Sequence, residues 1–175
     1  MVLKNTYNLY EGLQKLGITN LRQQQEAPMQ AIFDGKDAIV LMPTAGGKSL
    51  LYQLPAVMDA AGKLTLVISP LKALQLDQVD ALRSKGIRAA VLNSDLSAAE
   101  HSSVFEDMTR RGGLLYLAPE QLQNMAVADA LRTANLTRIA VDEAHTLPQA
   151  KDDFRKAYGK VGSFIHSLPH RPQVI

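Results

Sequence analysis

Short apolar runs alternate with longer segments of helical spacing, and this alternation is the feature that most limits the possible folds of the chain. Continuous runs of this kind are typical of strands that are buried on both faces. The expected strands are residues 38–42, 64–69, 89–93, 114–118 and 138–142. Strands that alternate with helices predict an α/β fold with a central parallel sheet and helices on both faces. Ligands of such sheets bind beyond the carboxyl ends of the strands.

Helical spacing predicts two helices before the first apolar run and further helices between the later runs. The opening helices are expected at residues 7–16 and 22–33. Ser97 is a candidate N-cap for a helix over the segment SAAEHSSVFEDMTRRG. The closing PQVI, residues 172–175, has the composition of the start of one more strand. We therefore expect the chain to be part of a longer protein.

Length and composition indicate an ordinary soluble domain. A chain of 175 residues has room for one good-sized core. Its net charge of +2 does not by itself indicate a nucleic-acid-binding protein. The absence of cysteine excludes disulfide and thiol chemistry within the chain. The N-terminus lacks the apolar core of a signal peptide, and no apolar run approaches the 18 or so residues of a membrane span. We expect a cytoplasmic location, associated with the nucleoid in a bacterium, or a nuclear one in a eukaryote, without a membrane partner.

The segment PTAGGKS, residues 43–49, follows the first apolar run and leads into a helical pattern. A strand-to-helix turn of this kind directs backbone N–H groups and a helix N-terminus at a common centre, which suits an anion. Lys48 could reach the β- and γ-phosphates of a nucleotide, and the Ser49 hydroxyl could bind magnesium. Met42 stands where the usual phosphate-loop pattern has its first glycine. The residues alone therefore leave open an ordinary small-residue turn with a solvated lysine.

A second motif, RIAVDEAH, places two carboxylates directly after an apolar run. The strand would deliver Asp142 and Glu143 to the same end of the sheet as the phosphate loop. Asp142 could hold magnesium, and Glu143 could orient and deprotonate an attacking water. Such a pair in isolation is usually a solvated acidic turn. Both motifs together favour nucleotide hydrolysis.

The segments PTAGGKS, SPLKALQLDQV, LNSDLS, LLYLAPEQL and AVDEAHTLPQ occur in the order and at the spacing of the RecQ-like DNA helicases, which the chain resembles over almost its whole length. These helicases belong to superfamily 2 and have a DEAH-type second motif. The resemblance implies the first RecA-like domain of a two-domain helicase core, spanning residues 1–175. Residues 1–35 would form N-terminal helices with an adenine-recognition motif, and residues 36–175 the P-loop core, truncated before the third helicase motif. It also implies the use of ATP and Mg²⁺, 3′–5′ translocation on single-stranded DNA, duplex unwinding in DNA repair and recombination, and a second RecA-like domain in cis.

The family motifs assign roles at the nucleotide residue by residue, and they make the missing first glycine normal for this superfamily. The expected catalytic residues are Lys48, Asp142, Glu143 and His145. The expected nucleotide contacts are Arg22, Gln25, Thr44, Ala45, Gly46, Gly47, Lys48 and Ser49, with Ser49 and Asp142 on Mg²⁺. Ala45 departs from the family's glycine, so we expect either a negative φ there or strain of about 1 kcal/mol or more.

The expected DNA contacts lie mainly on two loops that follow strands, SPLKAL and APEQL, with a further backbone contact at Asn93 and Ser94 and with Phe154 and Arg155 in the segment TLPQAKDDFRKAY. They are Ser69, Pro70, Leu71, Lys72, Asn93, Ser94, Pro119, Glu120, Phe154 and Arg155. Backbone N–H groups, hydroxyls and a lysine suit phosphate contacts, which position a strand without reading its sequence. Without the resemblance, these loops read as simple proline-containing turns. Gln121 stands where the family commonly has arginine.

The largest departure from the family is in TLPQAKDDFRKAY, where relatives have an aromatic-rich loop. Ala150 and Asp152 occupy its tryptophan and histidine positions, which leaves Phe154 as the one aromatic side chain suited to stack on a base. Stacking is worth about 1–3 kcal/mol per base. We therefore expect weakened or altered coupling between DNA binding and ATP turnover.

Three alternatives remain open at the level of sequence. The chain could belong to another superfamily 2 translocase or RNA helicase, to a small-molecule P-loop kinase, or to a nucleic-acid-binding module with impaired turnover. The kinase would need a lid and an acceptor site, for which no segment is evident. If the helicase reading holds, residues 1–175 alone should hydrolyse little ATP, because the second domain supplies an arginine worth about 10³–10⁵ in rate.

Overall fold

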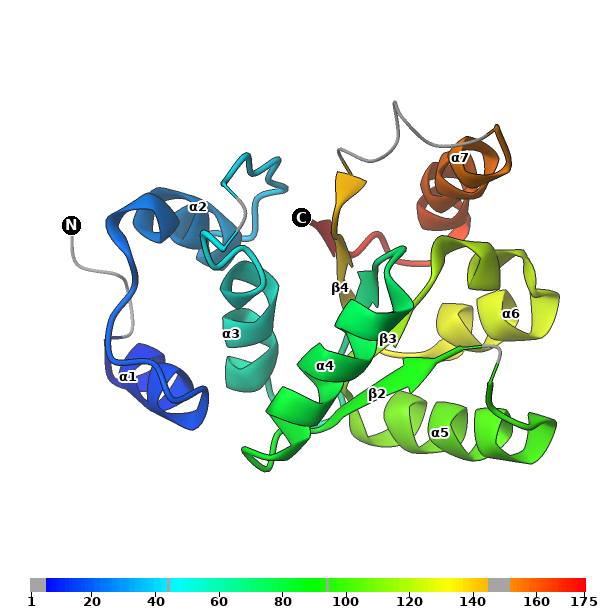
Figure 1. Ribbon diagram of the computed structural model, residues 1–175, viewed down its shortest axis with the longest axis horizontal. Coiled ribbons are helices and arrows are strands. Elements are labelled where there is room, and N and C mark those ends of the chain that lie inside the picture. The colour runs from blue at the N-terminus through cyan, green and yellow to red at the C-terminus, as the bar shows by residue number, and fades with distance from the viewer. Residues whose placement is uncertain (1–5, 44, 94, 145–151) are drawn as a thin grey trace.

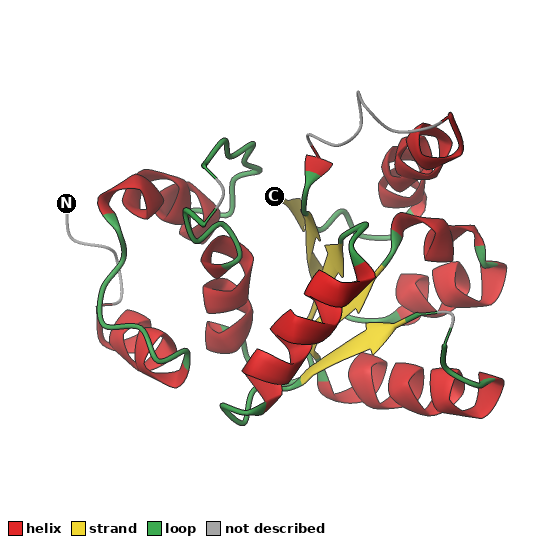
Figure 2. Ribbon diagram, viewed as in Figure 1, coloured by secondary structure: helices red, strands yellow, loops and turns green. Residues whose placement is uncertain are grey.

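The computed structural model describes residues 6–43, 45–93, 95–144 and 152–175. A five-stranded sheet in the order β2-β3-β1-β4-β5 stands at the centre, with helices around it (Figures 1 and 2). The strands are β1 Leu64–Ile68, β2 Ala89–Leu92, β3 Gly113–Leu117, β4 Leu136–Val141 and β5 Gln173–Val174. The helices are α1 Thr6–Lys15, α2 Gln23–Phe33, α3 Leu50–Met58, α4 Lys72–Arg83, α5 Ala98–Arg111, the 3₁₀ helix η1 Pro119–Gln123, α6 Met125–Thr133 and α7 Asp152–Ser167.

Every strand runs parallel to its neighbours, as the alternating pattern predicts. In the register of the sheet, Ile68 at the end of β1 lies beside Leu117 of β3 and Val141 of β4. All residues of β1 and β2 are buried, which explains why these strands read as continuous apolar runs. The carboxyl ends of β1, β3 and β4 therefore meet at one edge of the sheet, and the candidate site lies there.

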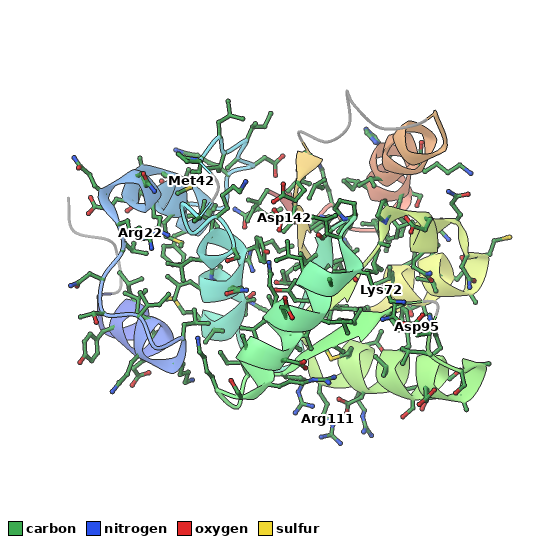
Figure 3. All side chains as sticks on the ribbon, viewed as in Figure 1. Arg22, Met42, Lys72, Asp95, Arg111 and Asp142 are labelled. Carbon is green, nitrogen blue, oxygen red and sulfur yellow. The ribbon has the colours of Figure 1, made fainter. Side chains whose placement is uncertain are left out.

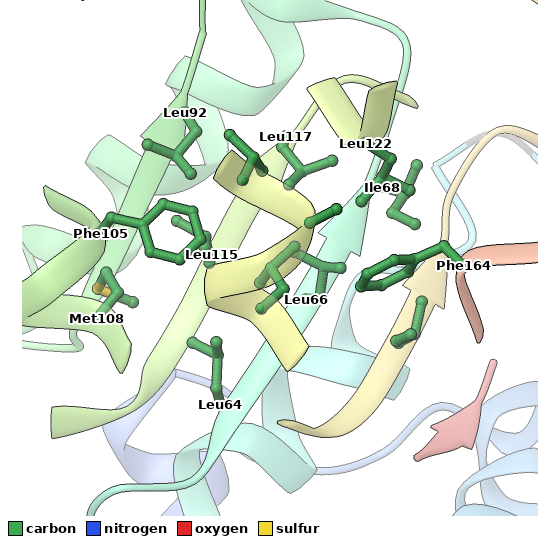
Figure 4. Packing of buried hydrophobic residues seen from close by; sticks show 14 of the residues in the cluster. Leu64, Leu66, Ile68, Leu92, Phe105, Met108, Leu115, Leu117, Leu122 and Phe164 are labelled. Carbon is green, nitrogen blue, oxygen red and sulfur yellow. The ribbon is translucent and has the colours of Figure 1, made fainter. Parts of the chain in front are cut away.

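One face of the sheet carries a core built with the C-terminal helices. Leu66 and Ile68 of β1 pack in the same cluster as Phe105 of α5 and Phe164 of α7 (Figure 4). The residues Val127, Ala128 and Leu131 of α6 complete the helical side of this cluster. Burying each large apolar side chain contributes about 1.5–3 kcal/mol.

The other face carries a second core, built with the N-terminal helices. Val67 of β1 and Tyr116 of β3 pack with Met29 of α2, Leu51 of α3 and Val79 of α4. Alternate residues of β1 thus point to opposite faces of the sheet. The expectation of helices on both faces is confirmed.

The strand predicted at residues 38–42 is wrong, because no strand is found there. Ile39 and Leu41 are 96% and 92% exposed, while Ala38 and Val40 pack partly against the second core. Among the described residues, the segment's one recorded bond toward the sheet runs from the Ala38 N–H to the Val174 carbonyl at 3.0 Å. The neighbouring β5 has only two residues, so it offers too little backbone to pair with the whole segment. The prediction that PQVI begins a strand is confirmed by β5.

Helix ends follow local chemistry. The Ser97 hydroxyl accepts a hydrogen bond from the Glu100 N–H, and the Glu100 carboxylate accepts one from the Ser97 N–H at 2.8 Å. This reciprocal pair confirms Ser97 as an N-cap. Gly112 follows α5 with a φ of 75°, which glycine adopts without a steric penalty. In the part of the chain that the structure describes, no helix is both long and apolar enough to cross a membrane.

Candidate functional site

The phosphate-loop motif forms a tight turn before α3. The Gly46 N–H donates to the Pro43 carbonyl at 3.0 Å, and Gly47 has a φ of 80°. Ala45 has a φ of 62°, so the strained alternative that the sequence allowed for this residue is the one that the structure contains. Ser49 is the N-cap of α3, and its hydroxyl makes no capping hydrogen bond.

Side chains from the start of α2 hold the carbonyl groups of this loop. Gln25 donates from Nε2 to the Gly47 carbonyl at 3.0 Å, and Arg22 donates from Nη1 to the Ala45 carbonyl at 2.8 Å. Gln24, which the sequence did not single out, donates from Nε2 to the Gly46 carbonyl at 3.2 Å. The two residues expected to recognise adenine therefore also contact the phosphate loop.

Both the oxygen and the nitrogen of the Gln25 side-chain amide form hydrogen bonds. Its Oε1 accepts a hydrogen bond from the Arg22 N–H at 2.8 Å, and the side chain is 2% exposed. A Cβ atom added to Gly47 would lie 2.5 Å from the Gln25 Nε2. Position 47 is therefore restricted to glycine both by its positive φ and by the approach of this amide.

The acidic motif lies at the end of β4, beside the phosphate loop. The Asp142 N–H donates to the Ile68 carbonyl of β1 at 2.8 Å, which places this residue at the carboxyl edge of the sheet. Glu143 has a φ of 55°, and its N–H donates to the Asp142 Oδ1 at 2.9 Å. Lys48 Nζ lies 3.8 Å from Glu143 Oε1. The position of the neighbouring Asp142 is labelled in Figure 3. Two motifs almost a hundred residues apart in sequence thus share one site.

A tyrosine that the sequence did not single out completes this end of the sheet. The Tyr52 hydroxyl lies 2.9 Å from Gln78 Oε1 on α4 and 3.2 Å from Asp142 Oδ2. Burial, together with the neighbouring Tyr116 and Asp142, raises the pKa of Tyr52 well above its ordinary value. The hydroxyl therefore stays protonated and acts as a donor. The sequence signal was a tyrosine within the apolar run of α3, since a buried hydroxyl needs a partner.

A cleft of about 1100 Å³ opens beside these residues. Lys48, Tyr52, Asp142 and Glu143 line it together with the apolar segment 38–42. Mg²⁺ typically binds through one or two carboxylates, waters and substrate phosphates. The Ser49 hydroxyl and the Asp142 carboxylate fit that donor set. No group of three or more metal-binding side chains occurs among the described residues.

The loop after β1 presents a mixed surface. Ser69 is 2% exposed, and its hydroxyl has no hydrogen-bond partner among the described residues. Leu71 is exposed, and Pro70 is half-buried. Lys72 forms an ion pair with Asp95 from the loop after β2 (Figure 3). The expected phosphate-binding lysine therefore already contacts a carboxylate.

The other loops expected to bind DNA are partly closed off. Asn93 is buried, and its Oδ1 accepts a hydrogen bond from the Asp95 N–H at 3.0 Å. Pro119 is buried at the start of η1, whereas Glu120 is exposed. Contacts from these loops to a ligand would therefore come from backbone groups and from the exposed residues Leu71, Lys72 and Glu120.

The remaining expected site residues lie either outside the described residues or at the start of α7. Thr44, Ser94 and His145 lie outside the described residues, as does Ala150. Phe154 and Arg155 belong to α7, so the backbone at these positions is helical rather than part of a loop. The expectation of a loop there is corrected over residues 152–155.

Comparisons with known proteins agree with this geometry. The family described as DEAD/DEAH box helicase matches residues 22–175. The probable ATP-dependent DNA helicase RecS of Bacillus subtilis is 40% identical over 160 residues, which cover 91% of this chain and 32% of that protein. The ATP-dependent DNA helicase RecQ of Pasteurella multocida is 39% identical over 157 residues, covering 89% of this chain and 24% of its own length. The chain thus spans a third or less of these two relatives.

A solved structure of the helicase MrfA bound to DNA has the same fold. It superposes with a TM-score of 0.76 over 100% of this chain and 26% of its own, at 22% sequence identity. The central parallel sheet and its surrounding helices are therefore those of a RecA-like domain. The family match and the relatives confirm the resemblance that the motifs predicted, and the chain belongs to the DEAD/DEAH box helicase family, with RecQ-type helicases among its relatives.

Proposed function

We propose that this chain is the ATP-binding half of a RecQ-type ATP-dependent DNA helicase. In this proposal, residues 1–175 form the first RecA-like domain and act with a second one in cis. The complete protein hydrolyses ATP, translocates 3′ to 5′ on single-stranded DNA and unwinds duplexes. The observation that carries the proposal is Lys48 within 3.8 Å of Glu143, where the phosphate loop meets the carboxyl end of β4.

The phosphate loop would bind the nucleotide's phosphates. Backbone N–H groups at the start of α3 and the ammonium group of Lys48 supply positive potential for them. Ser49 and Asp142 would hold Mg²⁺, which neutralises charge on the β- and γ-phosphates. Arg22 and Gln25, which contact the loop, would also face the base. This arrangement links recognition of the base to the shape of the phosphate loop.

Glu143 would act on the attacking water. Its carboxylate orients the water and accepts a proton as the oxygen attacks the γ-phosphorus. Lys48 lies next to Glu143, so its charge lowers the cost of bringing a carboxylate close to anionic phosphates. His145, from the same motif, would connect this site to the following helicase motif.

Single-stranded DNA would lie over the loops that follow β1 and β3. Lys72 and the backbone of residues 69–71 would contact phosphates, and Glu120 would lie beside them. These contacts position a strand without reading its sequence, as a translocating motor requires. Phe154 and Arg155 would contribute from the start of α7.

The decisive experiment is Glu143→Gln in the complete protein. We expect DNA-stimulated ATP turnover to fall at least about 100-fold while the affinity for ATP stays within about three-fold, because the change removes the base and keeps the shape. Glu106→Gln is a matched control, since it makes the same chemical change at an exposed position of α5, outside the candidate site and the expected DNA contacts. Full turnover in Glu143→Gln contradicts the proposed mechanism.

The nucleic acid that stimulates turnover tests the substrate class. We expect single-stranded DNA to stimulate the wild-type ATPase more strongly than RNA of the same sequence. Stronger stimulation by RNA identifies an RNA helicase instead. Nucleic-acid binding without ATP turnover in the wild-type protein identifies a binding module.

A further inference from the structure

The peptide group between Gly46 and Gly47 is the part of the phosphate loop that backbone sterics restrain least. Glycine adopts negative and positive φ with similar ease, so a peptide between two glycines can turn over without a clash at a Cβ atom. In a planar trans peptide, the C=O and N–H groups point in opposite directions. A turn of this peptide would therefore exchange the directions of the Gly46 carbonyl and the Gly47 N–H.

The peptide group before it is held at both of its ends. The Ala45 carbonyl accepts a hydrogen bond from Arg22 Nη1 at 2.8 Å. The Gly46 N–H of the same peptide donates to the Pro43 carbonyl at 3.0 Å. Both bonds oppose a change in the direction of this peptide.

The peptide group after it is held by two donors. The Gly47 carbonyl accepts hydrogen bonds from Gln25 Nε2 at 3.0 Å and from the Leu50 N–H at 3.2 Å. The second of these bonds belongs to the first turn at the start of α3. The loop backbone is thus fixed on both sides of the Gly46–Gly47 peptide.

Gln24 supplies the shorter of two hydrogen bonds to the Gly46–Gly47 peptide itself. Its Nε2 donates to the Gly46 carbonyl at 3.2 Å, whereas Gln25 Nε2 lies 3.5 Å from the same oxygen. Both donors come from α2, which lies beside the loop (Figure 1), so the carbonyl points toward that helix. The Gly47 N–H consequently points away from α2.

The direction of the Gly47 N–H matters because it begins a row of donors. The N–H groups of Gly47, Lys48 and Ser49 have no recorded acceptor in the part of the chain that the structure describes. Successive N–H groups of this kind at the start of a helix bind anions. A turned-over Gly46–Gly47 peptide would place a carbonyl oxygen where the first donor stands, and that oxygen would repel a phosphate.

We propose that Gln24 is a positioning residue for nucleotide binding, which holds the Gly46–Gly47 peptide so that the Gly47 N–H faces the phosphates. This inference rests on the proposed function. It assigns the effect of Gln24 to the phosphate chain of the nucleotide and not to its base. Gln25 remains as a longer second donor, so loss of Gln24 weakens binding without abolishing it.

Gln24→Met in the complete protein tests the positioning role, because it keeps the length of the side chain and removes the donor. We expect the Kd for ATP, measured with a fluorescent analogue, to rise about five-fold. We expect the DNA-stimulated kcat to stay within about two-fold of the wild type, since the bond acts equally on bound substrate and transition state. A loss of kcat with an unchanged Kd overturns the proposal.

Ligands that differ in their base separate an effect on the phosphates from an effect on the base. We expect Gln24→Met to raise the Kd for GTP and the inhibition constant of inorganic tripolyphosphate by the same factor of about five. Tripolyphosphate has no base, so its response reports on the loop alone. A loss confined to ATP identifies a contact with the base and overturns the proposal.

Gln24→Glu predicts a larger effect of the same sign. The carboxylate cannot donate, it repels the Gly46 carbonyl, and it favours the turned-over peptide, whose N–H would then face it. We expect the Kd for ATP to rise about 20-fold or more. Gln23→Glu places the same charge on the exposed neighbour in the first turn of α2 and should change the Kd by less than about three-fold. Equal losses in Gln24→Glu and Gln23→Glu mean that charge alone is responsible, and they overturn the proposal.

Gln23→Met is the matched control for Gln24→Met, and its Kd for ATP should equal that of the wild type. Thermal unfolding followed by circular dichroism establishes that each variant is folded. A wild-type protein that neither binds nor hydrolyses ATP overturns the proposed function and this inference together. A wild-type protein that binds and hydrolyses ATP, beside a folded Gln24→Met with unchanged affinity for ATP and tripolyphosphate, overturns the inference alone.

Discussion

Gln25 and Gly47 are joined by a hydrogen bond of 3.0 Å from the Gln25 side-chain amide to the Gly47 carbonyl. The residue expected to read the base therefore also supports the backbone expected to bind the phosphates. A change at Gln25 should consequently affect every nucleotide that uses the phosphate loop, whatever its base.

Gln25→Glu removes the donor and keeps the acceptor that binds the Arg22 N–H. We expect the affinity for ATP and for GTP to fall together by about 10-fold or more, because a buried carboxylate would then face the Gly47 carbonyl. Equilibrium binding of fluorescent ATP and GTP analogues measures both. Gln23→Glu, which makes the same charge change at an exposed neighbour, is the control. A loss confined to ATP means that Gln25 reads the base without supporting the loop.

Ala45→Gly relieves a left-handed conformation, since Ala45 has a φ of 62°. The gain of about 1 kcal/mol in the folded state is partly offset by the greater freedom of glycine in the unfolded chain. We expect the free energy of unfolding in urea to rise by up to about 0.5 kcal/mol.

Ala61→Gly is the control for Ala45, because Ala61 is exposed and is not among the described residues with a positive φ. There the same exchange should lower the free energy of unfolding by about 0.4–1 kcal/mol. Changes of the same sign at both positions would mean that Ala45 is not strained.

Arg138 anchors the end of the sheet remote from the site. It is 8% exposed, and its guanidinium donates to Asp59 Oδ2 at 3.0 Å, to Thr65 Oγ1 at 3.2 Å and to Gln173 Oε1 at 3.0 Å. We expect Arg138→Ala to lower the free energy of unfolding by about 1–3 kcal/mol, because Thr65 and Gln173 lose their donor and the half-buried Asp59 keeps Lys63 as its ion-pair partner but loses Arg138.

The exposed ion pair Arg88–Asp107 serves as the comparison for the buried Arg138. Arg88→Ala should cost less than about 1 kcal/mol in the same urea experiment. A restored stability in the double variant Arg138→Ala with Asp59→Ala would identify the loss of the Arg138–Asp59 ion pair as the cause of the lower stability. An Arg138→Ala protein as stable as Arg88→Ala contradicts the assignment.

Under the proposed function, Asp95 would compete with nucleic acid for Lys72, since the two side chains form an ion pair. We expect Asp95→Asn to raise the affinity of the complete protein for single-stranded DNA by about three-fold at low salt. We expect Lys72→Ala to lower this affinity and to reduce the slope of the logarithm of the binding constant against the logarithm of the salt concentration by about 0.7. Fluorescence anisotropy over a salt series measures both. Lys36→Ala, at an exposed position, should change neither quantity. Weaker binding by Asp95→Asn would mean that the pair organises the DNA site instead of blocking it.

Local patterns were sufficient for the strands that follow residue 43. Residues 66–68 and 139–141 read as strands because a strand covered on both faces carries apolar side chains at nearly every position. The meeting of Lys48 with the acidic motif followed from the parallel sheet, whose carboxyl ends share an edge. These predictions needed no knowledge of distant packing.

Other features depend on distant contacts and were missed. Tyr52 looked like one more core residue of α3, and only the approach of α4 and β4 gives its hydroxyl two acceptors. Gln24 was overlooked for the same reason, since its carbonyl partner at Gly46 lies 22 positions away. Residues 38–42 have the composition of a strand, but a strand requires a neighbouring backbone of matching length.

The extended segment 38–42 also has a consequence for the behaviour of the protein in concentrated solution. Its side chains Ile39 and Leu41 are almost wholly exposed, and at Ala38 its backbone bonds to β5 at the margin of the parallel sheet. Exposed apolar margins of this kind accept a strand from another polypeptide and so promote aggregation. A single charged residue at position 39 or 41 would discourage such pairing without disturbing either core, and it is the simplest route to a more soluble preparation of these residues.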